Sequence, residues 1–218
     1  RGDAKDLSRL SSILKKFDVV VGALPGGLGY RACKASIAAK TDMVDVSYMP
    51  EGVLSLNGPA LKAGVTVVPD CGMSPGLCSM FVGRGVSKLD EVDGAYMWNG
   101  GLPEKPVPPL GYVVTWSVKD LIDMYSRKVS IVKNGKVVQV EALSGLEEID
   151  FPGVGKLEAF FTDGLRTLLD TVKAKEMWEK TLRYPGHVEK IQLLKALGFF
   201  DSEAVEVSGT KVEPREVS

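Results

Sequence analysis

The sequence predicts an α/β fold that begins with a largely parallel sheet and continues into an α+β part with an antiparallel or mixed sheet. Strands that are apolar throughout, such as DVVVGAL and VTVVP, alternate with helical segments in the first third of the chain. This pattern is typical of parallel strands covered on both faces. From about Asp90 the strands alternate between apolar and polar residues, and Asn134-Gly135 is a strong signal for a type I′ hairpin turn.

The elements of the first part follow from local signals. Five apolar residues recur on one helical face of the opening segment: Leu7, Leu10, Ile13, Leu14 and Phe17. The next elements are expected in this order: strand 18–24, helix 28–40, strand 43–47, helix 54–64 and strand 65–69. Another helix is expected from Pro75, because proline suits the first helical turn.

The second part is expected to mix strands and helices. Its elements are expected in this order: strands 94–103 and 110–118, helix 117–128, hairpin 128–143, strand and helix 156–172, and helix 184–200. The change of pattern places a domain boundary near Ser87 to Glu91, so the expected domains are residues 1–88 and 89–202. The tail 203–218 has little apolar periodicity, so we expect it to fray or to begin a further segment.

Composition narrows the class of protein. The 27 basic and 28 acidic residues leave a net charge of −1, which gives no electrostatic case for nucleic acid or an anionic membrane. No apolar stretch reaches the roughly 20 residues of a membrane span, and the start does not read as a signal peptide. Cys33, Cys71 and Cys78 lack C-x-x-C spacing, which indicates reduced thiols in the cytoplasm rather than a disulfide framework or a metal site.

The segment GALPGGLGYRACKA contains Gly27-x-Gly29-x-x-Ala32, the spacing of a dinucleotide-binding turn, and the acidic Asp45 follows downstream. In a true turn of this kind the first glycine directly ends the first strand of the sheet. Here Ala23, Leu24, Pro25 and Gly26 lie between Gly22 and Gly27, and a helix precedes the strand. We therefore favour a later strand end of the same kind of sheet, whose loop lies at the carboxyl edge where ligands bind.

Several segments in order resemble the saccharopine dehydrogenase superfamily, and most closely its lysine 6-dehydrogenase branch. They run from about Leu7 to Phe200 and include GALPGGLG, MVDVSYMPE, PDCGMSPGL, GGLP with PPLGYVVTWSVKDLI, FTDGLRTLL and TLRYPGH. The resemblance implies a Rossmann domain that binds NAD or NADP, here without its first strands and glycine-rich turn. It also implies a second domain that binds an amino-acid substrate and forms a homodimer.

The resemblance implies that a set of strand-end residues contacts the cofactor. These are Gly22, Ala23, Leu24, Pro25, Asp45, Ser47 and Gly72. The first four are expected to contact the ribose or nicotinamide through their backbone, and a tight turn without a ligand is the alternative. Asp45 and Ser47 are expected to form a polar wall beside the nicotinamide, although Asp45 could instead cap a neighbouring turn.

The segment PDCGMSPGL is expected to contact the substrate, because its backbone donors precede a helix N-terminus. Asp70 is a candidate catalytic residue, and Cys71 and Ser74 are candidate substrate-binding residues, with packing as the alternative for Cys71. Saccharopine reductases commonly have Asp at the position of Ser74, a departure that disfavours saccharopine as the substrate. Tyr48 is expected to line the substrate entrance.

Three residues of the second part complete the expected site. Arginine offers a two-pronged fork for a carboxylate, and the resemblance implies that Arg183 holds the substrate's α-carboxylate. His187, the one histidine of the chain, is expected near the amine as the catalytic base, and Asp45 or Asp70 could serve instead if burial raises its pKa. A surface salt bridge for Arg183 and a structural role for His187 are the alternatives. Thr162 is expected either to cap a helix or to face the substrate.

The expected function follows from the resemblance and from amine chemistry. Hydride removal needs an unprotonated amine, and a free lysine amine has a pKa near 10.4, so the site must desolvate the amine or supply a base. We expect NAD(P)-dependent oxidative deamination of L-lysine at its ε-amine to the semialdehyde, without a metal. The alternatives are a reductase that forms saccharopine or carboxynorspermidine, and a non-catalytic fragment used for dimerisation or sensing.

Overall fold

The computed structural model describes residues 2–217, which divide into two compact units. Unit 1 comprises the chain up to Asp90 together with Arg166–Val172, and unit 2 comprises Glu91–Leu165 and the chain from Lys173 onward. The sequence places residues 166–172 within a second domain, whereas their contacts place them in unit 1. A short return of the chain therefore contributes to the first unit.

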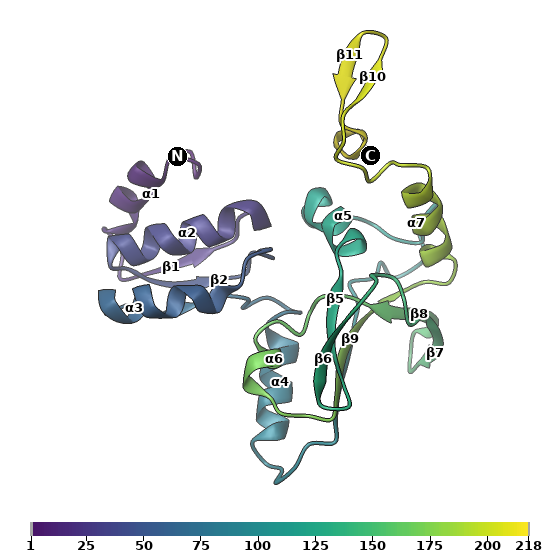
Figure 1. The fold of residues 1–218 in the computed structure, drawn as a ribbon, viewed down its shortest axis with the longest axis horizontal. Helices are drawn as coiled ribbons and strands as arrows, with labels where there is room; N and C mark the ends of the chain where they lie inside the picture. The colour runs from purple at the N-terminus through teal and green to yellow at the C-terminus, as the bar shows by residue number, and fades with distance from the viewer. Residues whose placement is uncertain (1, 218) are drawn as a thin grey trace. The chain divides into compact units, whose positions relative to one another are not determined.

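Unit 1 is built on a three-stranded parallel sheet with the order β1-β2-β3. Its elements in chain order are α1 (Leu7–Leu14), β1 (Val19–Gly22), α2 (Gly26–Ala39), β2 (Asp42–Asp45), the 3₁₀-helix η1 (Val53–Leu56), α3 (Asn57–Ala63), β3 (Val67–Val68), α4 (Leu77–Val86) and α6 (Leu168–Thr171). Figure 1 shows α2 and α3 beside β1 and β2. The expected order of strands and helices up to β3 is confirmed.

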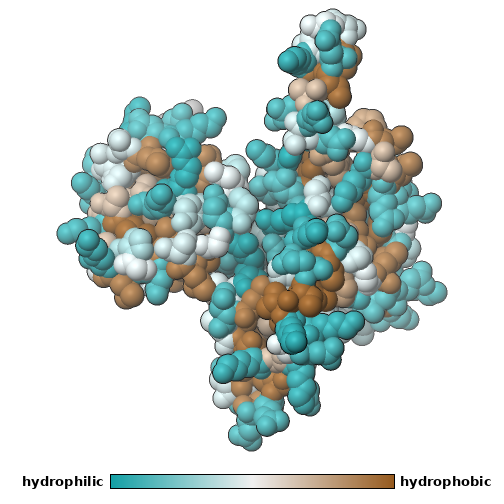
Figure 2. Space-filling view, in the orientation of Figure 1, coloured by the Kyte–Doolittle hydropathy of each residue, from teal (hydrophilic) through white to brown (hydrophobic). Residues whose placement is uncertain are grey.

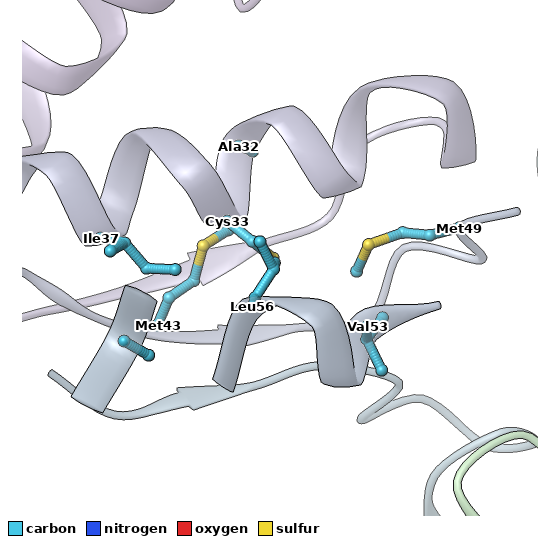
Figure 3. Close-up of a cluster of buried hydrophobic side chains, with 8 residues drawn as sticks. Ala32, Cys33, Ile37, Met43, Met49, Val53 and Leu56 are labelled. Carbon is cyan, nitrogen blue, oxygen red and sulfur yellow. The ribbon is translucent and has the colours of Figure 1, made fainter. Parts of the chain in front are cut away.

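The core of unit 1 lies on one face of this sheet. Val20 of β1 and Met43 of β2 are paired in register and point to the same side. They pack with side chains of α2 and η1 such as Cys33 and Leu56, and Figure 3 shows Met43, Cys33 and Leu56 close together in this cluster. The next side chain along β1, Val21, is 77% exposed. Within unit 1 the sheet is therefore covered by α2 and α3 on one face only, and the expectation of two covered faces is wrong at this position.

Helix α4 begins later than the sequence predicts. Pro75 lies before the helix, Gly76 occupies the N-cap position with φ 138°, and the first helical residue is Leu77. None of the α4 residues is buried, and its exposed apolar side chains include Met80 and Phe81. Figure 2 shows hydrophobic residues at the surface in the region of α4 and α6.

Unit 2 contains a six-stranded mixed sheet with the order β6-β5-β9-β8-β7, in which β4 also pairs with β9. Its elements are β4 (Gly94–Asn99), α5 (Val118–Ser126), β5 (Val129–Lys133), β6 (Lys136–Val140), β7 (Glu147–Phe151), β8 (Gly155–Phe161), β9 (Glu176–Arg183), α7 (His187–Ala196), β10 (Val205–Val207), β11 (Thr210–Val212) and the 3₁₀-helix η2 (Pro214–Glu216). Strand β4 runs parallel to β9, whereas β5 and β8 run antiparallel to it. The expected antiparallel or mixed sheet is confirmed.

The local signals of unit 2 were strong for some elements and misleading for others. Asn134 and Gly135 have φ values of 51° and 71°, as a type I′ turn between β5 and β6 requires. Residues 110–118 form no strand, although their pattern predicts one. The tail, which was expected to fray or to begin a further segment, forms the antiparallel hairpin β10–β11. The central strand β9 and the edge strand β7 were not predicted.

Within residues 2–217, no helix is long and apolar enough to cross a membrane. The longest α-helix described, α2, has 14 residues, whereas a span needs about 20. Across the same residues, no group of three or more His, Cys, Asp or Glu side chains is placed to hold a metal ion.

Candidate functional site

Gly22 ends β1 directly beside the carboxylate of Asp45, its partner in the register of β1 and β2. A Cβ at Gly22 would overlap Asp45 Oδ2 and the side chain of Met43. Asp45 itself is fully buried. Glycine is therefore required at this strand end, because a larger residue would displace a buried carboxylate.

Asp45 and Ser47 form a polar cluster at the carboxyl end of β2. Ser47 donates its backbone N–H to Asp45 Oδ1 at 2.7 Å, and Leu24 donates its backbone N–H to Ser47 Oγ at 3.2 Å. The other oxygen, Asp45 Oδ2, is buried and has no hydrogen-bond partner among the described residues. An unsatisfied buried acceptor is costly, so this oxygen is available to a donor of a bound group.

The remaining residues expected to contact the cofactor differ in their exposure and in whether their backbone N–H groups are already hydrogen-bonded. Ala23 and Pro25 are exposed beside the start of α2. Gly72 donates its backbone N–H to the carbonyl of Pro75 at 3.0 Å, so this donor is used within the loop. Gly29 lies inside α2, where a Cβ would approach Ser47 Cβ at 2.5 Å. The glycine of the apparent fingerprint thus permits close packing of helix against strand.

The PDCGMSPGL loop places Asp70 against an arginine from a distant part of the sequence. Asp70 Oδ2 lies 3.1 Å from Arg166 Nε, and both side chains are largely buried. Arg166 also donates through a terminal nitrogen to the carbonyl of Glu51 at 3.1 Å. The buried ion pair gives Asp70 an anchoring role for Arg166, and its expected catalytic role stays a prediction.

The other residues expected to contact the substrate in unit 1 are Cys71, Ser74 and Tyr48. Cys71 is half-buried and donates its backbone N–H to the carbonyl of Asp45 at 2.9 Å. The hydroxyl oxygen of Ser74 is buried without a hydrogen-bond partner among the described residues. Tyr48 is half-buried after the end of β2. Their expected contacts with a substrate stay predictions.

In unit 2 one face of the sheet collects the polar side chains. Alternate residues of β9 point to the same face, so Glu179, Thr181 and Arg183 lie in a row. The register pairs Thr181 with Asn99 of β4 and with Phe160 of β8. Most of these side chains are buried, and β9 is therefore the element that organises this part of the site.

Arg183 is buried at 3% exposure, which excludes the surface salt bridge that was its alternative. Its guanidinium carbon lies 4.1 Å from the centre of the Tyr112 ring, and one terminal nitrogen donates to the carbonyl of Leu182 at 2.8 Å. Across the described chain it forms no salt bridge, and its Nε atom has no hydrogen-bond partner. A buried cation without an anion is unfavourable on its own, so Arg183 is well suited to hold a carboxylate ligand.

His187 opens α7 and is almost fully buried. Its Nδ1 lies 2.9 Å from the carbonyl of Leu110 and its Nε2 lies 2.9 Å from the hydroxyl of Tyr125. Because a carbonyl only accepts, Nδ1 carries the proton and Nε2 accepts from Tyr125. Burial lowers the pKa of His187 to about 4. The geometry therefore favours a structural role over the expected role as base, which stays a prediction.

Thr162 does not cap a helix, because α6 begins only at Leu168. Its hydroxyl instead donates to Glu179 Oε2 at 2.7 Å and lies 2.7 Å from the hydroxyl of Thr181. Asn99 donates its amide to Glu179 Oε1. Glu179 is buried, and this desolvation raises its pKa to about 7. The sequence offered no signal for this carboxylate, because β9 itself was not predicted.

Two family models match the chain. Residues 2–68 match the saccharopine dehydrogenase NADP binding domain, and residues 72–217 match the saccharopine dehydrogenase C-terminal domain. The chain belongs to the saccharopine dehydrogenase family. The resemblance seen in the sequence is confirmed at this level, and the nucleotide class of the first model agrees with the expected NAD or NADP.

Two relatives of this saccharopine dehydrogenase family member are identical to it at between a quarter and a third of the aligned residues. It is 27% identical to saccharopine dehydrogenase [NADP(+), L-glutamate-forming] of Saccharomyces cerevisiae, over 94% of this chain and 49% of that protein. It is 29% identical to the mitochondrial alpha-aminoadipic semialdehyde synthase of Bos taurus, over 92% of this chain and 23% of that protein. The chain thus spans about half the length of the first relative, and less of the second.

A solved structure gives the same answer for the fold. The apo saccharopine dehydrogenase (L-Glu forming) of Saccharomyces cerevisiae superposes with a TM-score of 0.71 at 25% identity, over 94% of this chain and 49% of that one. The predicted fold class is confirmed. The names of these relatives refer to saccharopine and alpha-aminoadipic semialdehyde, so closeness to the lysine 6-dehydrogenase branch stays a prediction.

Proposed function

We propose that the protein is an NADP-dependent oxidoreductase that cleaves a C–N bond of an amino-acid substrate, with saccharopine as the substrate that its relatives favour. The observation that carries this proposal is the buried guanidinium of Arg183 without a carboxylate partner, in a chain of the saccharopine dehydrogenase family. Arg183 holds one carboxylate of the substrate. Because charge-assisted bonds to a fork are directional, this contact also orients the chain that carries the amine.

The reaction balances with water and one oxidised nucleotide. The secondary ammonium of saccharopine first loses a proton and becomes a neutral amine. The lysine-side carbon next to this nitrogen then gives a hydride to NADP⁺, which leaves a protonated imine. Water then adds to the imine carbon and the C–N bond breaks. The products are L-glutamate, alpha-aminoadipic semialdehyde, NADPH and a proton. The protein's task is to bind, orient and deprotonate the amine.

The residues of unit 1 fit part of a dinucleotide. The unpartnered Asp45 Oδ2 accepts a donor such as a ribose hydroxyl or the nicotinamide carboxamide. Gly22 leaves the space that this carboxylate occupies at the strand end. The nucleotide supplies the hydride acceptor when it is bound. Asp45 would position the nucleotide by accepting one of its hydrogen-bond donors at Oδ2.

Oxidative deamination of L-lysine at the ε-amine is the second candidate. Serine at position 74, where saccharopine reductases commonly carry aspartate, is the feature that favours it. Saccharopine oxidation and lysine deamination both place an amino-acid carboxylate on Arg183, so the geometry of unit 2 is compatible with either reaction. Carboxynorspermidine formation, or use of the chain as a sensor, predicts no NADPH with either amino acid.

A homodimer in the cytoplasm completes the proposal. Trp98 is 42% exposed and Tyr96 is 47% exposed on β4, and both contact the ring of Trp178. Exposed aromatic clusters of this kind are typical of protein interfaces. The cysteines form no disulfide, which suits a reducing compartment. Light scattering of the full-length protein tests the dimer, and a monomer at micromolar concentration contradicts it.

NADPH absorbance tests the activity directly. We expect the full-length protein to reduce NADP⁺ with saccharopine, and kcat/KM to fall about 10- to 100-fold in Arg183→Lys because the fork is lost. The matched control is the exposed Arg84→Lys. Rapid NADPH formation with lysine but not with saccharopine assigns the second candidate. A loss of less than about twofold in Arg183→Lys contradicts the carboxylate contact.

A further inference from the structure

Glu179 is a buried carboxyl group that the proposed reaction has not used. Its side chain is held by three hydrogen-bond donors, one from β4 and two from the loop after β8: the Asn99 amide, the Thr162 hydroxyl and the backbone N–H of Gly164. A Cβ at Gly164 would approach Glu179 Oε2 at 2.5 Å, so the chain is shaped around this carboxylate. Among the described residues Glu179 forms no salt bridge. It can therefore exchange a proton without breaking an ion pair.

The hydroxyls of Thr162 and Thr181 form a chain that leads away from Glu179. Thr162 donates its one proton to Glu179 Oε2, so the short contact of 2.7 Å between the two hydroxyls requires Thr181 to donate to Thr162. The oxygen of Thr181 then keeps a lone pair for a further donor. The direction of every proton in this chain points toward the ionised carboxylate.

This chain ends on the face of the sheet that carries Arg183. Thr181 and Arg183 are two residues apart on β9 and point to the same side, so their side chains start about 7 Å apart. An amino acid whose carboxylate lies on Arg183 carries its reacting nitrogen several bonds away. Its N–H group can therefore reach Thr181 while its carboxylate stays on the guanidinium.

We propose that Glu179 is the proton acceptor for the substrate amine, and that Thr181 and Thr162 relay the proton to it. The inference rests on the proposed oxidation. The protonated amine gives its proton to Thr181 Oγ1, Thr181 gives its own to Thr162 Oγ1, and Thr162 gives its own to Glu179 Oε2. The ammonium becomes a neutral amine and the carboxylate becomes a carboxylic acid, so charge and protons balance. Thr181 is the residue that touches the amine.

The surroundings set the pH at which this relay works. The pKa of Glu179 is raised to about 7, mainly by burial and to a smaller extent by the negative charge of Asp163, after the hydrogen bonds from Thr162, Asn99 and Gly164 have lowered it. Asp163 is itself 3.4 Å from Arg127, which offsets part of its charge. The carboxylate must be ionised to accept a proton, so the rate is expected to rise with pH through about 7.

The test is the pH profile of kcat/KM for NADPH formation from saccharopine, measured from about pH 5.5 to 9 on the full-length protein. Glu179→Gln keeps the shape of the side chain but accepts no proton. We expect kcat to fall about 100-fold and the acidic limb near pH 7 to disappear. Thr162→Val cuts the relay and is expected to do the same, whereas Thr162→Ser keeps a hydroxyl and restores kcat to within about threefold of wild type.

NADPH binding and tryptophan fluorescence at pH 8 show that each variant is folded, and the Thr162→Val and Thr162→Ser pair decides the question if Glu179→Gln misfolds. The relay is overturned if Glu179→Gln or Thr162→Val keeps the acidic limb and activity within about twofold of wild type. A wild-type protein that forms no NADPH from saccharopine or from lysine contradicts the proposed function itself. An active wild type with unaltered variants contradicts only the relay.

Discussion

His187 accepts the hydroxyl proton of Tyr125 at Nε2 over 2.9 Å, which fixes the imidazole in its neutral form because Nδ1–H is already directed at the carbonyl of Leu110. Tyr125 is also buried. Desolvation raises the pKa of its hydroxyl, whereas the charge and the hydrogen bond of Arg183 act to lower it. The pair therefore supports the surroundings of Arg183 by hydrogen bonding. A protonated His187 could no longer accept from Tyr125, so this arrangement depends on pH.

The stability of unit 2 is expected to fall as acid protonates the unfolded histidine. The folded pKa of His187 is about 4 against an ordinary value of 6.5, so between these values the unfolded chain binds a proton that the folded chain does not. This linkage lowers the free energy of unfolding by about 3 kcal/mol between pH 7 and 4. Because Trp98, Trp116 and Trp178 all lie in unit 2, urea unfolding followed by tryptophan fluorescence measures it. His187→Gln should show a shallower pH dependence, and parallel curves contradict the assignment.

Glu179 should act in the opposite direction. Its folded pKa is about 7 against an ordinary 4.5, so the folded chain binds the extra proton and stability is lost as the pH rises through 7. Glu179→Gln removes this penalty and should make unit 2 more stable than wild type at pH 8 by about 1–3 kcal/mol, with little difference at pH 5. The exposed Glu148→Gln is the control. A less stable Glu179→Gln at both pH values means that the carboxylate is needed for folding.

The end of β1 should not tolerate a side chain. Gly22→Ala places a methyl group against Asp45 Oδ2, and overpacking of this kind costs about 1–3 kcal/mol. Hydrogen exchange of the β2 amides, measured by mass spectrometry, should be about 10- to 100-fold faster in this variant. Gly27→Ala is the matched control, because nothing lies within 4 Å of its Cβ position. Equal protection in the two variants contradicts the steric account.

The ion pair of Asp70 and Arg166 should hold the segment Arg166–Val172 in unit 1. Removing one partner of a buried pair costs about 3–5 kcal/mol, because the other charge stays buried. Asp70→Asn is therefore expected to speed hydrogen exchange of the α6 amides at least about tenfold. Arg166→Gln should have a similar effect, and the double variant should cost less than the sum of the two. Additive effects contradict direct coupling.

Much of the fold was predictable because its signals are local. The helical period of the opening segment and the turn at Asn134-Gly135 each depend on residues close in sequence. Strand β9 was missed because its residues from Met177 onward are mostly buried regardless of polarity, so no alternation appears. Residues 110–118 show the converse error, since their apolar side chains are used in a loop.

The sequence by itself determined the order of elements in unit 1 up to β3, the family, and the choice of Arg183 as a carboxylate ligand candidate, because these follow from motifs and residue chemistry. Only the tertiary structure decided which polar groups are satisfied. In the folded chain both ring nitrogens of His187 are hydrogen-bonded, and Asp70 forms an ion pair with Arg166. Glu179 is buried beside the hydroxyls of two threonines. The reason is physical: burial and hydrogen bonding set the protonation of a side chain, and both depend on neighbours that strand pairing brings together.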